Sequence, residues 1–179
     1  MRTLLALLML GAPALGDTCP PLPDRAGERA QLLAEAHEAP DARAGRIAMN
    51  ALWEFWATAP DDRAQDLLDR GMERRASYDF EAAHDAFDAL VNYCPHYAEG
   101  YNQRGFVHFL RGQYGYALED LNRALARDPQ HVAAMAGKAV TLMNLGRIKA
   151  GQAVLREALT LNPWLPERGM LLAEPGEEL

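Results

Sequence analysis

The sequence predicts an all-α protein, a solenoid of repeated helix–turn–helix units, and four recurring columns of residues predict it. Prolines recur 34 residues apart at Pro95, Pro129 and Pro163. Small residues recur at the same interval in two columns: Gly71, Gly105 and Ala139, then Ala83, Ala117 and Gly151. Large apolar residues form the fourth column, at Phe87, Leu121 and Leu155. A fixed period of this length is the sequence signature of stacked helical repeats.

The N-terminal segment predicts export. Arg2 precedes an apolar run, Leu4–Leu10, that is too short to span a bilayer, and small residues follow it. We expect residues 1–16 to be a signal peptide cleaved after Gly16, and 17–27 to be an N-terminal tail. The alternative is an N-terminal core helix. Export would place the chain in the periplasm or outside the cell, with no membrane insertion after cleavage.

The repeat columns divide the rest of the chain. We predict a degenerate capping repeat over 28–63, three clear repeats over 64–97, 98–131 and 132–165, and a C-terminal cap with an acidic tail over 166–179. Within each unit the two small columns fall where two antiparallel helices cross closely. Glycine in the turns, as at Gly112 and Gly146, suits the position past a helix end. Proline then ends the second helix, because it lacks the N–H that would extend it.

The same columns resemble the tetratricopeptide repeat family, whose period and residue order they match. The resemblance implies a groove, lined by the first helix of each repeat, in which a protein partner lies. Carried over by position, the predicted groove residues are Leu68, Met72, Arg75, Asn102, Phe106, Phe109, Val140, Met143 and Asn144. Family members that grip a C-terminal carboxylate place basic residues where this chain has Leu68 and Met72, so we expect that clamp to be absent. The alternative is a groove filled by the chain's own N-terminal segment or C-terminal tail.

Composition and motifs favour binding over catalysis. The chain has 179 residues, 49% hydrophobic and 24% charged, and its net charge of −7 argues against a general affinity for nucleic acid or anionic lipid. The sequence carries no phosphate loop, dinucleotide fingerprint or HExxH motif. His84 and Asp88 share a helix face, but two ligands are too few for a metal site. We predict no catalytic residues, no cofactor and no bound metal.

Two further features concern individual side chains. In an oxidising compartment Cys19 and Cys94 would form one disulfide, which tethers the tail and stabilises the fold by about 4–5 kcal/mol; the alternative is two thiols too far apart. The aromatic cluster around Trp53 is either the buried face of the capping repeat or an anchor for a partner. His96 and His131 follow repeat-ending prolines and are expected at the groove margin.

The predicted function is therefore a periplasmic protein–protein interaction module, an adaptor or assembly factor that binds a protein segment in its groove. A second hypothesis is a structural subunit of an envelope complex, or a homodimer, with a self-covered groove.

Overall fold

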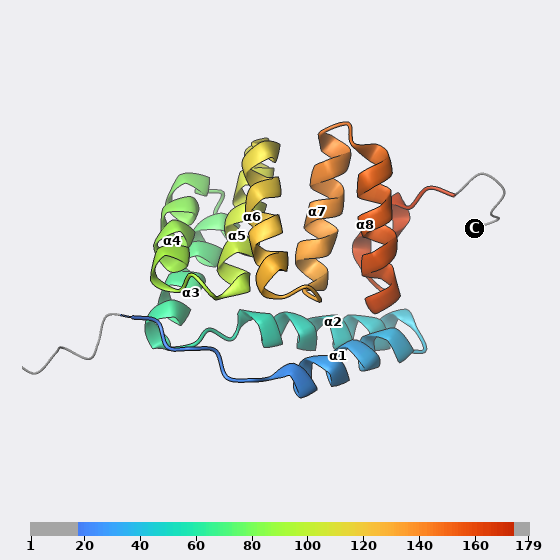
Figure 1. Cartoon of the computed structure of the whole chain (residues 1–179), viewed down its shortest axis with the longest axis horizontal. Helices are drawn as coiled ribbons and strands as arrows, with labels where there is room; N and C mark the ends of the chain where they lie inside the picture. The colour runs from blue at the N-terminus through green and yellow to red at the C-terminus, as the bar shows by residue number, and fades with distance from the viewer. Residues whose placement is uncertain (1–17, 174–179) are drawn as a thin grey trace, which may run out of the picture.

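The computed structural model describes residues 18–173, and every regular element in that range is a helix (Figure 1). The α-helices are α1 Ala26–Glu38, α2 Ala42–Ala57, α3 Asp62–Ala76, α4 Phe80–Tyr93, α5 Ala98–Leu110, α6 Tyr114–Arg127, α7 Val132–Asn144 and α8 Ile148–Leu161, followed by a 3-10 helix, η1, Pro166–Met170. The predicted all-α solenoid is confirmed. The expected signal peptide and the acidic tail from Glu174 lie outside the described residues. None of the described helices has the length and apolar character that a bilayer crossing requires.

The three clear repeats are the helix pairs α3–α4, α5–α6 and α7–α8, which stand side by side in Figure 1. The small-residue columns lie where the two helices of a pair cross. A Cβ atom added to Gly71 would lie 2.3 Å from the Phe87 ring, and one added to Gly151 would lie 2.7 Å from the Ala139 carbonyl oxygen. Real side chains do not approach this closely, so the crossings require glycine at these positions.

The turns inside the repeats use the left-handed backbone conformation. Gly112 and Gly146 have φ of 70° and 75°, a region that glycine enters without a steric penalty. The equivalent position in the first repeat is Tyr78, with φ of 63°. A residue with a Cβ atom is strained there by about 1–2 kcal/mol. The first turn is therefore less favourable than its two copies.

The N-terminal helices α1 and α2 pair with each other, with Pro40 in the turn between them. The pair lies across the lower ends of the upright helices rather than ahead of α3 in the stack (Figure 1). Apolar side chains of α1 and α2 share one core cluster with α7, α8 and the C-terminal segment: Leu33, Ala36, Ala48, Leu52, Trp56, Val132, Met135, Ala136, Ala158 and Leu165.

The α1–α2 pair does not stack on α3 as one repeat stacks on the next, and α3 gives the physical reason. Its outward face carries Asp66, Asp69, Arg70 and Glu73, all exposed and spaced along one side of the helix. That face offers a preceding helix pair no apolar surface to bury. The start of α7 and the second half of α8 do offer it.

The pair α1 and α2 forms a helical hairpin, and Trp56 of α2 fixes this hairpin in place. Its ring stacks on that of His131, with centroids 4.3 Å apart and an interplanar angle of 14°. Its Nε1–H donates a 2.8 Å hydrogen bond to the Asp128 carboxylate, and Arg29 donates to the same carboxylate at 2.9 Å. The Tyr97 hydroxyl donates to the Trp56 carbonyl oxygen at 2.5 Å. The segments between the repeats are thus the surface on which the hairpin docks.

Cys19 and Cys94 form a disulfide, with their Cα atoms 5.1 Å apart. Cys94 is fully buried at the end of α4. The bridge holds the N-terminal tail against the turn between α4 and α5, and Arg25 then donates a 3.3 Å hydrogen bond to the Phe55 carbonyl oxygen of α2. The tail therefore reaches α1 along the outside of the repeats.

The C-terminal segment, which includes the 3-10 helix η1, packs on α8. The Gln152 side chain donates to the Met170 carbonyl oxygen at 2.8 Å and accepts from the Leu172 N–H at 2.7 Å. The Trp164 ring lies directly against Gly45 of α2, where an added Cβ would lie 2.3 Å from it. The C-terminal segment therefore touches both the last repeat and the N-terminal hairpin.

Candidate functional site

A hollow of about 330 Å³ lies on the inner side of α3, α5 and α7, and it is the groove of the repeats. Five of the nine predicted groove residues line it: Arg75, Asn102, Phe106, Phe109 and Val140. Phe106 lines the hollow with 42% of its surface exposed, although it is a large aromatic residue. An apolar hollow with a few polar groups at its edge is the usual form of a binding site.

The other four predicted residues lie elsewhere. Leu68 is fully buried in a core cluster with Ala57 and Tyr97, and Met72 packs against the same cluster. The linker that follows α2 and the start of α5 cover this part of α3, so it forms core instead of groove. Met143 packs at the crossing of α7 with α8. Asn144 is exposed and donates a hydrogen bond to a carbonyl of its own helix.

The sequence did not predict all of the walls. Trp53 of α2 is 49% exposed and lines the hollow on one side, and Glu167 of η1 lines it as well. The aromatic cluster of α2 therefore divides between two roles: Trp56 is buried in the core, and Trp53 faces the groove. Helical spacing alone could not have separated the two, because residues three apart lie on the same side of a helix.

Polar side chains along one edge of the groove form a connected hydrogen-bond network. The Arg75 guanidinium lies 5.0 Å from the centre of the Phe106 ring and donates to the Gln103 side-chain oxygen. Gln103 donates in turn to Glu99 at 2.5 Å, and Asn102 donates to the other Glu99 oxygen at 2.9 Å. Burial lowers the pKa of Arg75, and the nearby charge of Glu99 only partly offsets this.

The same hydrogen-bond network reaches the α1–α2 hairpin through Glu99. Its carboxylate is almost fully buried and lies 2.8 Å from Nε2 of His131, on which Trp56 stacks. His131 was expected at the groove margin, and this expectation is wrong, because the ring is 1% exposed beneath the hairpin. His96 is partly buried and contacts the Pro20 carbonyl oxygen of the tail at 2.8 Å. Docking of the hairpin and the polar edge of the groove thus share one set of hydrogen bonds.

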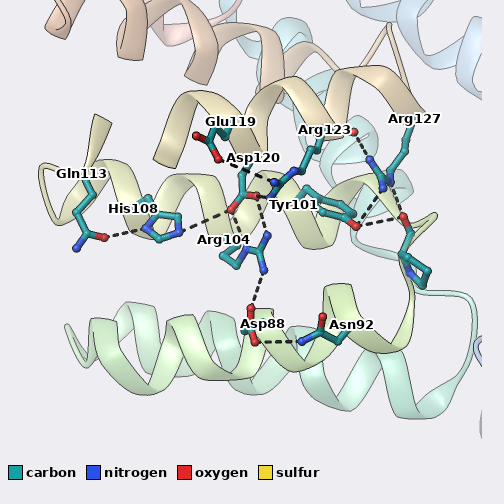
Figure 2. A network of polar contacts seen from close by, with 11 residues as sticks. Asp88, Asn92, Tyr101, Arg104, His108, Gln113, Glu119, Asp120, Arg123 and Arg127 are labelled. Carbon is teal, nitrogen blue, oxygen red and sulfur yellow. Dashed lines mark hydrogen bonds and ion pairs between the residues drawn. The ribbon is translucent and has the colours of Figure 1, made fainter. Parts of the chain in front are cut away.

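A second polar network, shown in Figure 2, ties the repeats together on the other side of α5. Arg104 donates two 2.7 Å hydrogen bonds to Asp120 of α6 and one of 2.7 Å to Asp88 of α4. Burial opposes the charge of Arg104, but the hydrogen bonds and charges of the two carboxylates outweigh it and raise the pKa of Arg104. Both carboxylates compensate the buried cation, so we assign this network to the geometry of the repeats.

The described residues 18–173 contain no cluster of three His, Cys, Asp or Glu side chains that could hold a metal ion. His84 lies 3.7 Å from Asp85 and stacks edge-on against His108, whose Nδ1 lies 2.8 Å from the Gln113 side-chain oxygen. The groove offers a different chemistry: an exposed aromatic floor, a Trp wall, and amide and guanidinium donors. These groups suit the binding of an extended segment that carries apolar side chains.

Comparison with known proteins agrees with this geometry. A family model described as tetratricopeptide repeat matches residues 108–174. A tetratricopeptide repeat protein 36 homolog of Nematostella vectensis is 38% identical over 44% of this chain and 45% of its own length. A TPR repeat-containing protein of Rhizobium etli is 28% identical over 63% of this chain and 49% of its own. The chain contains tetratricopeptide repeat sequence over residues 108–174, and it spans about half the length of the curated relatives it matches.

Solved structures show the same fold. The TPR2B domain of yeast Sti1, in a complex with an Hsp70 peptide, has a TM-score of 0.58 at 21% identity and covers 62% of this chain and 90% of its own. The first TPR of Spaghetti (RPAP3), bound to an HSP90 peptide, has a TM-score of 0.59 at 18% identity, over 60% and 86%. MamA protein has a TM-score of 0.51 at 18% identity, over 84% and 81%.

Proposed function

We propose that this protein is a periplasmic adaptor or assembly factor that binds a segment of another protein in its inner groove. The observation that carries the proposal is Phe106, a large aromatic residue left 42% exposed in the lining of a hollow of about 330 Å³. Soluble proteins seldom leave such apolar surface uncovered in a concave site unless a ligand covers it. That two tetratricopeptide repeat domains of the same fold are complexes with Hsp70 or HSP90 peptides supports this mode of binding.

The groove favours a particular kind of segment. Phe106, Phe109 and Val140 would receive one or two apolar side chains. Asn102 and Gln103 at the polar edge would hydrogen-bond the backbone of the segment. Leu68 and Met72 lie in the core, so we do not expect the clamp by which some family members grip a C-terminal carboxylate.

The disulfide supports the compartment that we propose. A disulfide between Cys19 and Cys94 persists in an oxidising environment such as the periplasm, whereas cytosolic proteins keep thiols reduced. The signal peptide expected over residues 1–16 points the same way. A fusion of these residues to a reporter enzyme that folds only after export would test the compartment directly.

The path of the tail favours an adaptor over the second hypothesis, a structural subunit with a self-covered groove. Between Cys19 and Arg25 the tail runs past His96 and Tyr97, on the outside of the repeats. It does not enter the hollow around Phe106, so this segment leaves the groove open.

Site-specific photo-cross-linking in cells tests the proposal. A photoreactive phenylalanine would replace Phe106, and a matched control would replace Tyr116, which is 62% exposed and lies in the next helix outside the groove. We expect protein adducts from position 106 that are absent from position 116. The adducts should disappear when Phe109→Glu is added, with thermal unfolding confirming that this variant folds.

If position 106 yields only cross-links within the chain, or the same adducts as position 116, the groove is not the binding site. The second hypothesis then becomes the better one, and light scattering of the purified protein would show whether the chain forms a homodimer.

A further inference from the structure

The groove continues past Trp53 along one face of α2. Arg43, Arg46, Asn50 and Trp53 follow one another at helical spacing and therefore share that face. Trp53 lines the groove, and the other three line a second hollow of about 780 Å³. The opposite walls are also continuous, because Glu167 of η1 lines the groove while its two neighbours line the second hollow. The same two elements, α2 and the C-terminal segment, thus border both hollows.

The second hollow is positively charged, although the chain as a whole carries a net charge of −7. Its lining includes three arginines, Arg43, Arg46 and Arg168, and no Asp or Glu. Arg43 and Arg46 make no ion pair with any carboxylate in residues 18–173, and Arg168 donates its hydrogen bond to the Trp164 carbonyl oxygen at 3.0 Å. The guanidinium groups of the hollow are therefore available to a ligand.

Two acidic side chains lie next to this surface in sequence: Glu167, which lines the groove, and Asp41, which is engaged with the backbone of α2. Asp41 precedes α2 and accepts hydrogen bonds from the backbone N–H groups of Arg43 and Ala44, at 2.8 and 2.9 Å. It serves as the N-cap of the helix. Beside the arginines lie apolar side chains, Met49 and the 62% exposed Ile47. The surface combines positive charge with apolar area in one concave region.

We propose that the bound segment continues from the groove along α2 and places two or more Asp or Glu side chains against Arg43, Arg46 and Arg168. This inference rests on the proposed function and names the partner more closely: an extended protein segment with an apolar anchor flanked by an acidic stretch. Charge complementarity is the argument, because Asp and Glu carboxylates are the groups of a protein segment that would pair with three guanidinium groups that the described chain leaves without carboxylates. The acidic stretch sets which partner is accepted, and the apolar anchor supplies most of the affinity.

Selection from a phage-displayed library of random dodecapeptides on the purified, disulfide-bonded protein tests this inference. We expect the selected peptides to combine an aromatic or large aliphatic residue with at least two acidic ones. A labelled synthetic copy of a selected peptide is then titrated, by fluorescence anisotropy, with four forms of the protein. They are the wild type, Arg43→Glu with Arg46→Glu, Phe106→Glu, and the control Arg147→Glu with Lys149→Glu, which makes the same charge change at exposed positions away from both hollows.

The expected loss of affinity in the Arg43/Arg46 variant is about tenfold, from two exposed ion pairs lost, and it should shrink as salt is added. The Arg147/Lys149 control should bind within about twofold of the wild type. Selected peptides without acidic residues, or an equal loss in both charge-reversed variants, would overturn the inference. If Phe106→Glu abolishes binding while the Arg43/Arg46 variant does not weaken it, this inference fails and the proposed function stands.

Two other results would also count against it. If Phe106→Glu leaves the peptide affinity unchanged, or selection yields no peptide, the proposed function fails and the extension along α2 fails with it. If the wild type sediments with phosphatidylglycerol vesicles, and the Arg43/Arg46 variant but not the control loses this binding, the arginines serve a lipid surface instead.

Discussion

Replacing Trp56 tests whether the N-terminal hairpin is docked as the structure shows. Trp56 is 6% exposed, so Trp56→Ala removes a buried indole from the cluster that joins α2 to α7 and α8. Buried Trp→Ala changes lower the free energy of unfolding by about 3–5 kcal/mol. Trp56→Phe keeps a ring over His131 and loses the hydrogen bond to Asp128, which still accepts from Arg29. That change should lower it by only about 1–2 kcal/mol.

Trp53→Ala is the matched control, because Trp53 lies on the same helix and is 49% exposed. It should lower the free energy of unfolding by less than about 1 kcal/mol. Urea unfolding, monitored by far-ultraviolet circular dichroism with the disulfide intact, measures all three variants. The dependence of the unfolding free energy on urea concentration is compared between them. If Trp56→Ala costs no more than Trp53→Ala, the hairpin does not pack on the repeats and the arrangement of the groove wall is wrong.

Three further changes test other features. Replacing Cys19 and Cys94 together by Ser should lower the free energy of unfolding by about 4 kcal/mol, since the bridge closes a separation of 75 residues; a reductant should destabilise the wild type in urea and leave the variant unchanged. Gly71→Ala should cost about 1–3 kcal/mol in urea unfolding, because its Cβ would meet the buried Phe87 ring, and a neutral result would mean that the crossing of α3 and α4 is looser than it is in the structure. Tyr78→Gly should raise the free energy of unfolding by about 0.5–1 kcal/mol by relieving a positive φ, and a loss of thermal stability would contradict that explanation.

The repeats could be predicted because each one depends on its own residues and on its nearest neighbours. Gly71, Ala83 and Phe87 serve one crossing, and the same three columns return in the next two units, so the period reveals the geometry. Inward positions in the middle of the stack were predictable for the same reason, and Phe106 and Val140 do face the groove.

The rest depends on where the hairpin lies, and no local pattern encodes that. Leu68 has the same repeat position as the groove residue Asn102, yet the linker after α2 and the start of α5 bury it. The sequence places His131 at the groove margin, but Trp56 of α2 covers its ring. Trp53 and Trp56 sit three positions apart in one aromatic cluster, and only the long-range contacts of α2 decide which of them faces the groove. Contacts that join residues far apart in the chain leave no periodic trace in the sequence.

The hairpin laid across the stack changes how such a protein should come apart and come together. In an open array of repeats each unit can melt on its own, because it touches only the units beside it. Here the first two helices share a core with the last two, so unfolding of α8 would also expose apolar side chains of α1. We expect a single cooperative transition instead of fraying from the ends. During synthesis the same contacts delay the docking of α1 and α2. Their apolar face is made before the repeats and stays uncovered until the last repeat has been made.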